Sequence, residues 1–167
     1  AFPRSFKNIE VLCEAISLLS EKNQENIELR LTINGNENRY ARYIYGKYNA
    51  FSPIKFIGLK TKAQINDEFK DASIIVFPSK LETWGLPISE AKDLNKPLLV
   101  SDLQYARETV GDYEMVSFLS PDEPQKWADC FKNISDGTFK FSGNTLETPG
   151  VPFVKDWDSL SSFVLNL

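Results

Sequence analysis

Apolar and polar positions along the chain follow two different periods, one typical of helices and one typical of strands, and segments with the two periods alternate. Residues 8–22 carry apolar side chains at intervals of three and four, which predicts an amphipathic helix. Residues 27–33, I-E-L-R-L-T-I, alternate apolar and polar positions, which is typical of a strand. The turn-forming sequence Asn-Gly-Asn at 34–36 ends this strand. The chain therefore begins with helix, strand and turn in succession.

The same two periods continue through most of the sequence. They predict further strands at 54–58, 72–78, 96–101 and 114–119, and further helices at 37–48, 61–70, 87–95, 104–110, 123–135 and 156–165. Residues 72–78, A-S-I-I-V-F-P, are apolar almost throughout, as in a strand covered on both faces, and Thr61 is a predicted helix cap. Alternating strands and helices predict an α/β fold: a Rossmann-like, doubly wound parallel sheet with helices on both faces.

The length of 167 residues corresponds to about one domain. After residue 136 the sequence becomes rich in Gly, Thr and Pro and loses its period. We therefore expect a Rossmann-like domain at 1–136, followed at 137–167 by an irregular segment and a C-terminal helix that packs on the same domain. Because the chain opens without methionine, we expect it to be a fragment of a longer protein.

Composition excludes several classes of protein. No apolar run approaches the roughly 20 residues of a membrane span, so no transmembrane segment is expected. The formal charge of −4 argues against a general nucleic-acid binder. Cys13 and Cys130 lie in separate apolar helical patterns, which predicts buried free thiols in a reducing cytosol. A disulfide between them is the alternative.

The chain contains no histidine. This excludes Ser-His-Asp and Cys-His catalysis within the chain. It also excludes His-based zinc sites, and two isolated cysteines cannot supply the ligands instead, so no metal site is expected. Chemistry in this chain must therefore rely on carboxylates, cations, hydroxyls or backbone dipoles.

Ligands of parallel sheets bind outside the carboxyl ends of the strands. After the most apolar strand comes S-K-L-E-T-W-G-L-P-I-S-E-A-K at 79–92, in which Glu82 and Glu90 flank a glycine turn. Gly85 allows close backbone approach, and Pro87 favours a helix start, whose unpaired N–H groups attract anions. The carboxylates would accept hydrogen bonds from hydroxyls, so the combination suits a ligand with phosphates and sugar hydroxyls.

Spacing alone leaves other interpretations of the two acids open. Many helices carry Glu in their first turn, so both acids could be structural. A glycosidase-type acid/base pair is less favoured, because Glu82 and Glu90 straddle a turn beside an anion site.

The segment P-S-K-L-E-T-W-G-L-P-I-S-E-A at 78–91 resembles the E-x7-E motif of retaining glycosyltransferases with the GT-B fold (glycosyltransferases group 1, family 4). Trp84 replaces the usual Phe. Four other segments are also similar to the C-terminal domain of that family. They are the N-terminal P-R-S-F-K-N, the stretch I-E-L-R-L-T-I-N-G-N-E, the run from 54 to 79, and K-P-L-L-V-S-D-L-Q-Y-A-R-E-T-V-G-D. The resemblance covers about residues 1–135.

The resemblance implies separate roles for the two acids. Glu90 would hold the ribose hydroxyls of a nucleotide-sugar donor, and Glu82 would lie near the donor sugar. Arg4 and Lys7 would neutralise the diphosphate and stabilise it as the leaving group, Lys7 being the firmer assignment; solvated surface cations are the alternative. The implied catalytic set is therefore Arg4, Lys7 and Glu82.

The resemblance also implies a set of donor contacts. Backbone N–H groups would bind the sugar and phosphate, and the loop after the second predicted strand would contact the base. The implied donor-binding residues are Gly58, Lys60, Thr83, Trp84, Gly85, Leu86 and Glu90.

These assignments imply the donor-binding domain of a metal-independent, retaining glycosyltransferase of polysaccharide or glycan biosynthesis. Its partners would be the nucleotide-diphosphate-sugar donor and an N-terminal acceptor domain, which this chain lacks; no other cofactor is expected. The implied location is cytoplasmic or peripheral to the inner face of the membrane. We expect the isolated domain to be inactive. Two alternatives are a non-enzymatic nucleotide-binding or regulatory domain and a sugar-nucleotide epimerase of related fold.

The sheet order implied by the family, 3-2-1-4-5-6, puts the first strand in the centre, and this chain begins at or just after that strand. Either residues 1–2 are a stub of it, or something else fills the gap.

Overall fold

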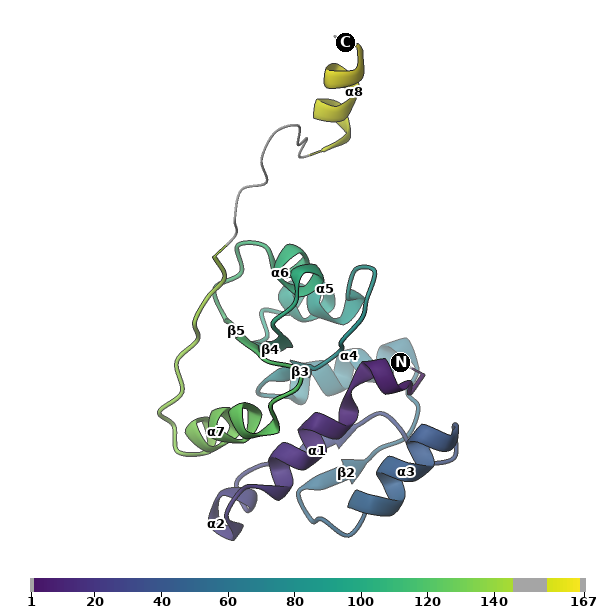
Figure 1. The fold of residues 1–167 in the computed structure, drawn as a ribbon, viewed down its shortest axis with the longest axis vertical. Helices are drawn as coiled ribbons and strands as arrows, with labels where there is room; N and C mark the ends of the chain where they lie inside the picture. Colours follow the sequence, from purple (N-terminus) through teal and green to yellow (C-terminus); the bar gives the residue numbers. More distant parts are fainter. Residues whose placement is uncertain (1, 146–155, 166–167) are drawn as a thin grey trace.

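The computed structural model describes residues 2–145 and 156–165 (Figure 1). Its strands are β1 (Leu29–Leu31), β2 (Ile54–Phe56), β3 (Ile75–Phe77), β4 (Leu98–Ser101) and β5 (Val116–Leu119). Its helices are the 3-10 helix η1 (Ser5–Lys7), α1 (Ile9–Ser17), α2 (Glu21–Gln24), α3 (Arg39–Tyr48), α4 (Lys62–Asp71), α5 (Leu86–Asp93), α6 (Gln104–Val110), α7 (Pro124–Ser135) and α8 (Trp157–Leu165). The alternation of strands and helices predicted from the sequence is confirmed.

All described strand pairs are parallel, and they form two groups. β1 pairs with β2, with Leu29 opposite Ile54, while β4 lies between β3 and β5. Strand β4 is buried along its whole length, as expected for a central strand covered on both faces. The predicted parallel α/β architecture is therefore confirmed, although the described strands do not form one continuous sheet.

Helices cover both faces of the strands. One apolar cluster joins α1, α3 and α7 to β1 and β2, and Trp127 of α7 is fully buried within it. A second cluster joins α5 and α6 to β3, β4 and β5, and Phe69 of α4 packs against it. Figure 1 shows α1 and α7 side by side below β3, β4 and β5, with α5 and α6 above these three strands.

Most differences from the sequence-based prediction concern element ends. The predicted helix at 8–22 ends at Ser17, whose hydroxyl donates to the carbonyl of Glu14 at 2.7 Å, and a separate short helix α2 follows. A serine that bonds its own helix backbone in this way weakens the helix locally. The predicted cap at Thr61 is confirmed, since its hydroxyl accepts from the N–H of Gln64 and the Gln64 side chain accepts from the N–H of Thr61.

The predicted free, buried thiols are also confirmed, because Cys13 and Cys130 are buried and unpaired. Residues 137–145 are irregular but tied to the fold. Gly143 donates its N–H to Val116 at 3.1 Å, and the Asn144 amide donates to the carbonyl of Gly111 at 2.8 Å.

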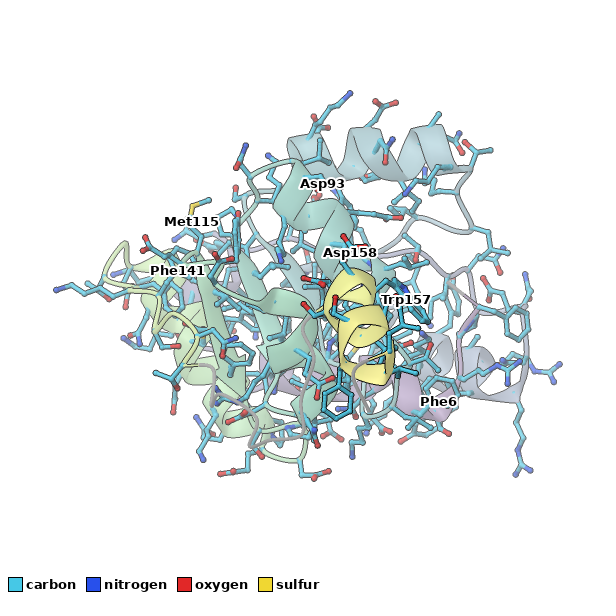
Figure 2. All side chains as sticks on the ribbon, turned by 90° about the horizontal axis from the view of Figure 1, so that it is seen from above. Phe6, Asp93, Met115, Phe141, Trp157 and Asp158 are labelled. Atoms are coloured by element: carbon cyan, nitrogen blue, oxygen red, sulfur yellow. The ribbon has the colours of Figure 1, made fainter. Side chains whose placement is uncertain are left out.

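The C-terminal helix α8 exists as predicted, and it lies apart from the strands in Figure 1. It has no buried residue, and Trp157 is 83% exposed (Figure 2). The packing of this helix on the domain stays a prediction. The irregular segment predicted before this helix is described only as far as residue 145, and residues 146–155 lie outside the described residues.

Candidate functional site

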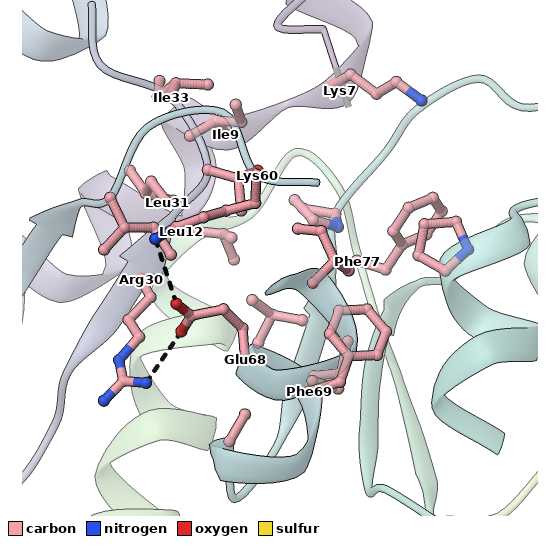
Figure 3. A pocket seen from close by; sticks show the side chains of 18 of the residues that line it. Lys7, Ile9, Leu12, Arg30, Leu31, Ile33, Lys60, Glu68, Phe69 and Phe77 are labelled. Atoms are coloured by element: carbon pink, nitrogen blue, oxygen red, sulfur yellow. Dashed lines mark hydrogen bonds and ion pairs between the residues drawn. The ribbon is translucent and has the colours of Figure 1, made fainter. Parts of the chain in front are cut away.

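A cleft of about 490 Å³ lies along β1 and β3, and its lining includes residues that follow the carboxyl ends of both strands. Both apolar and charged side chains line it. Figure 3 shows Leu12 and Leu31 on one side of the cleft and Phe69 and Phe77 on the other. The lining residues that come from the N-terminal segment and from the loops and helices after β2 and β3 include Lys7, Lys60, Lys62, Ser79, Pro87 and Glu90. Most of these belong to the loops and helix starts that the sequence analysis singled out.

The loop after β3 turns sharply into α5 at Gly85. This glycine has a φ of +81°, and a Cβ added to it would lie 3.2 Å from Cδ1 of Ile88. Both the left-handed backbone and the close contact favour glycine here. Pro87 lies in the first turn of α5, as predicted, where its missing N–H leaves no hydrogen bond unmade.

Helix α6 holds this loop from one side. The hydroxyl of Tyr105 donates to the carbonyl of Ser79 at 2.7 Å, and that of Thr109 bonds to the carbonyl of Trp84. Burial raises the pKa of Tyr105, and the negative charge of nearby Glu82 raises it further, so the phenol stays protonated and remains a donor. Two residues one helical turn apart therefore hold both ends of the Glu82 segment.

The N-terminal segment holds the loop from the other side. Lys80 donates its N–H to the carbonyl of Phe6 at 2.7 Å, and the hydroxyl of Ser79 donates to the same carbonyl at 3.2 Å. Asn8, which has a left-handed φ of 54°, donates its side-chain amide to Pro78 at 3.2 Å and to Pro121 at 2.8 Å. These bonds fix η1 above the end of β3.

Lys7, which lines the cleft, forms an ion pair with Glu82. Their side chains are only 22% and 15% exposed, so solvent screens this pair less than a surface pair. The ammonium of Lys7 also lies 5.4 Å from the ring centroid of Phe6 and 6.0 Å from that of Phe77. The structure thus brings together two of the residues assigned to catalysis.

A second ion pair joins Glu90 on α5 to Lys62 at the first position of α4. Their side chains are 30% and 62% exposed. Lys60 lies 3.7 Å from Glu68, which also accepts from Arg30 at 3.0 Å, as the dashed lines in Figure 3 show. Each acid of the motif is therefore paired with a lysine from a different part of the chain.

The other predicted residues are more exposed. Arg4 is exposed and forms no ion pair within the described residues. Trp84 is 53% exposed, and its indole N–H donates to Ser89 at 3.3 Å. Thr83 and Leu86 are exposed beside it, and Gly58, with a φ of +71°, follows β2. Their roles toward a ligand stay predictions.

Sequence reasoning missed the residues that support the site: Lys62, Asn8, Tyr105 and Thr109. For Tyr105 and Thr109 a signal existed, because a spacing of four puts both on one face of the predicted helix at 104–110. The partner of Glu90 had no signal, since Lys62 follows an unrelated strand.

The arrangement can exchange partners with a ligand. A phosphate could take over the hydrogen bonds of the lysines, while hydroxyls could donate to the released carboxylates. Within residues 2–145 and 156–165, no group of three or more Cys, Asp or Glu side chains could hold a metal ion. Nor is any helix in this part of the chain long and apolar enough to cross a membrane.

Comparison with known proteins matches residues 3–138 to the family described as Glycosyl transferases group 1. A 66-residue part of the chain is 32% identical to the O-antigen chain mannosyltransferase RfbU of Salmonella typhimurium. That part is 40% of this chain but only 18% of RfbU.

Among solved structures, HepE (Alr3699) of Anabaena, crystallised in complex with UDP-glucose, resembles this fold with a TM-score of 0.67. The sequence identity is 19%, and the match covers 82% of this chain and 38% of HepE. The chain thus spans well under half the length of both proteins.

Proposed function

The chain belongs to the Glycosyl transferases group 1 family, and on this premise we propose that it is the donor-binding domain of a glycosyltransferase. The complete enzyme would transfer a sugar from a nucleotide-diphosphate-sugar to an acceptor, with retention of configuration and without a metal. The observation that carries the proposal is the pairing of both motif acids with lysines, Lys7 and Lys62, that line one cleft. The relative RfbU, described as an O-antigen chain mannosyltransferase, supports a role in polysaccharide synthesis.

The proposal gives each charged group one task. Lys7, with Arg4, neutralises the diphosphate as it leaves, which lowers the barrier by stabilising developing negative charge. Glu82 accepts hydrogen bonds from the donor sugar, and Glu90 accepts them from the ribose. Neither acid transfers a proton.

The remaining contacts in the proposal come from the two glycine loops. Backbone N–H groups of Thr83, Trp84, Gly85 and Leu86 bind the sugar and phosphate, while Gly58 and Lys60 face the base. No cofactor other than the donor is assigned. An N-terminal domain would supply the acceptor site, and the buried free thiols favour a reducing, cytoplasmic location.

Calorimetric titration of the chain with UDP, GDP and ADP tests the proposal. We expect one nucleotide to bind, and to bind equally well in the presence of EDTA. Glu90→Gln should weaken that binding by roughly 1–3 kcal/mol, since the amide is a poorer acceptor than the carboxylate. Glu25→Gln, which removes the same charge from an exposed position at the end of α2, is the matched control and should bind as the original chain does.

Two results would count against the proposal. Absence of binding at millimolar nucleotide would favour a regulatory domain that has lost donor chemistry. Equal affinity of Glu90→Gln and Glu25→Gln would remove the ribose assignment. Retention itself requires the complete enzyme, and the configuration of the product decides it.

A further inference from the structure

Helix α6 is short, and contacts from two other parts of the chain hold its C-terminal end. It has 7 residues, and a helix of that length is marginal by itself, so tertiary contacts decide its position. The ammonium of Lys92, on α5, donates to the carbonyls of Thr109 at 3.0 Å and Val110 at 2.7 Å. The side-chain amide of Asn144 donates to the carbonyl of Arg107 at 2.9 Å. The position of α6 therefore depends on a lysine of α5 and on the segment that follows α7.

The contact between Lys92 and α6 is favourable for two reasons. The last carbonyls of a helix have no partner within it, so the lysine supplies hydrogen bonds that the helix itself cannot make. A helix also carries partial negative charge at its C-terminal end, where a cation stabilises it. Because Lys92 is only partly exposed, solvent screens this attraction less than it would on the open surface. Lys92 thus joins α6 to α5.

The same end of α6 holds the loop that carries Glu82. The hydroxyl of the buried Thr109 bonds to the carbonyl of Trp84, two residues after Glu82. The carbonyl of the same threonine accepts from Lys92. The other end of the loop is also bonded to α6, at the carbonyl of Ser79. A movement of α6 relative to α5 would therefore displace both ends of this loop.

Helix α5 carries the other acid of the motif on its opposite side. Successive residues of a helix are about 100° apart, so Glu90 and Lys92 point in directions about 200° apart. Glu90 faces α4, where it pairs with Lys62, and Lys92 faces α6. Helices α5 and α6 also pack against each other through one apolar cluster. Helix α5 therefore connects the acid that it carries to the helix that holds the loop of Glu82.

We propose that Lys92 is a positioning residue of the donor site, because it holds α6 against α5 and so fixes the position of Glu82 relative to Glu90. The inference rests on the proposed function, which assigns both acids to one ligand. A nucleoside diphosphate would reach both Glu90 and the loop, so it gains affinity when their separation is correct before it binds. A nucleoside would reach only Glu90, and pyrophosphate only the loop and Lys7, so neither depends on that separation.

Lys92→Met tests the proposal, because methionine keeps an unbranched side chain and a high helix propensity but removes the cation. NMR titrations compare UDP, GDP and ADP with their nucleosides and with pyrophosphate. For the nucleotide that binds the original chain, we expect an affinity at least about fivefold lower in the variant. The affinities for its nucleoside and for pyrophosphate should change less than about twofold, a difference that a general loss of stability would not produce. Lys92→Arg, which keeps a cation that donates to carbonyls, should restore the affinity.

Amide hydrogen exchange without ligand reports on the loop itself. The N–H of Lys80 donates to the carbonyl of Phe6, and it should exchange at least about threefold faster in Lys92→Met than in Lys96→Met. Lys96→Met is the matched control, because Lys96 donates to the carbonyls of Lys70 and Ala72 at the end of α4. Among the described residues, α4 makes no hydrogen bond to the loop of Glu82.

Two results would overturn the inference. One is an equal exchange rate of the Lys80 amide in Lys92→Met and Lys96→Met. The other is an equal loss of affinity for nucleotide, nucleoside and pyrophosphate, which would show that Lys92 only stabilises the fold. Absence of nucleotide binding by the original chain would instead refute the proposed function, and the exchange of the Lys80 amide would then decide by itself whether Lys92 positions the loop.

Discussion

Removal of one hydroxyl, in Tyr105→Phe, tests whether α6 positions the loop that carries Glu82. The phenol donates to the carbonyl of Ser79 at 2.7 Å, three residues before Glu82, and the aromatic ring packs against the apolar cluster of α5 and α6. Phenylalanine keeps the ring and its packing, so the change removes the hydrogen bond and little else.

The magnitude follows from the surroundings of the bond. A net hydrogen bond contributes about 0.5–1.5 kcal/mol, and a buried carbonyl left without its partner raises the cost to about 1–3 kcal/mol. Since Tyr105 is only partly buried, we expect a loss of about 1–2 kcal/mol in the free energy of unfolding. For a chain of this size that corresponds to a fall of about 3–6 °C in Tm.

The loop would also lose part of its order before a ligand binds. If ordering it again costs about 1 kcal/mol, nucleotide affinity falls about fivefold. Thermal unfolding followed by circular dichroism gives the first number, and calorimetry with the nucleotide gives the second.

Tyr113→Phe is the matched control for this prediction. Its hydroxyl donates to the carbonyl of Lys96 at 3.0 Å, and burial raises its pKa too, but it does not touch the motif loop. We expect a comparable fall in Tm with unchanged nucleotide affinity. If Tyr105→Phe lowers Tm yet binds nucleotide as well as Tyr113→Phe does, the hydroxyl only stabilises the fold and the positioning argument is wrong.

Two further predictions concern stability. Gly85→Ala should lower the free energy of unfolding by about 1–3 kcal/mol, because Gly85 has a φ of +81° and an added Cβ would lie close to Ile88. Gly46→Ala in α3, where nothing lies within 4 Å of an added Cβ, should raise the free energy of unfolding by about 0.5–1 kcal/mol. Urea unfolding measures both, and equal effects of the two substitutions would contradict the strain argument. Burial raises the pKa of Cys13 and Cys130 from 9.0 to about 12, so as the pH rises the unfolded chain loses these protons before the folded chain does. The contribution of the two thiols to the free energy of unfolding is therefore fully present below pH 9 and is lost as the pH rises toward 12. At pH 10 each thiol should lower the free energy of unfolding by about 1.4 kcal/mol relative to pH 7. Cys13→Ala should therefore reduce the fall in the free energy of unfolding between pH 7 and pH 10 by that amount. An unchanged fall would show that the thiol does not ionise on unfolding.

Much of the fold was predictable because it depends on local periods. The apolar run at 72–78 and the alternation at 27–33 each produced a strand, although the strands observed, 75–77 and 29–31, are shorter. The exact ends depend on pairing partners, which the pattern of one strand does not contain. The interruption between β1 and β3 was anticipated only as a gap, because the sequence does not show which helices border it.

The site was predictable where it is contiguous in sequence. Glu82, Gly85 and Glu90 lie on one loop and helix start, so their spacing carried the prediction. Lys62 lies at the start of α4 and meets Glu90 only because two crossovers bring α4 and α5 to the same edge. Tertiary contacts of this kind leave no period in the sequence, so Lys62 could be found only from the structure.

The two ion pairs explain how a cleft with balanced charge could still attract an anionic ligand. Lys7 and Lys62 each face one carboxylate, so the two pairs carry no net charge, and the chain as a whole carries −4. Partly exposed ion pairs contribute only about 0–1 kcal/mol each, whereas hydrogen bonds to charged groups contribute about 1.5–3 kcal/mol. Exchange of a Lys–Glu pair for a Lys–phosphate bond and a hydroxyl–carboxylate bond is therefore favourable for a ligand that carries both groups. A bare phosphate would leave Glu82 or Glu90 without a partner, and a neutral sugar would leave the lysine without one, so under the proposed function the paired arrangement would favour a ligand that carries phosphate and hydroxyls in the same molecule.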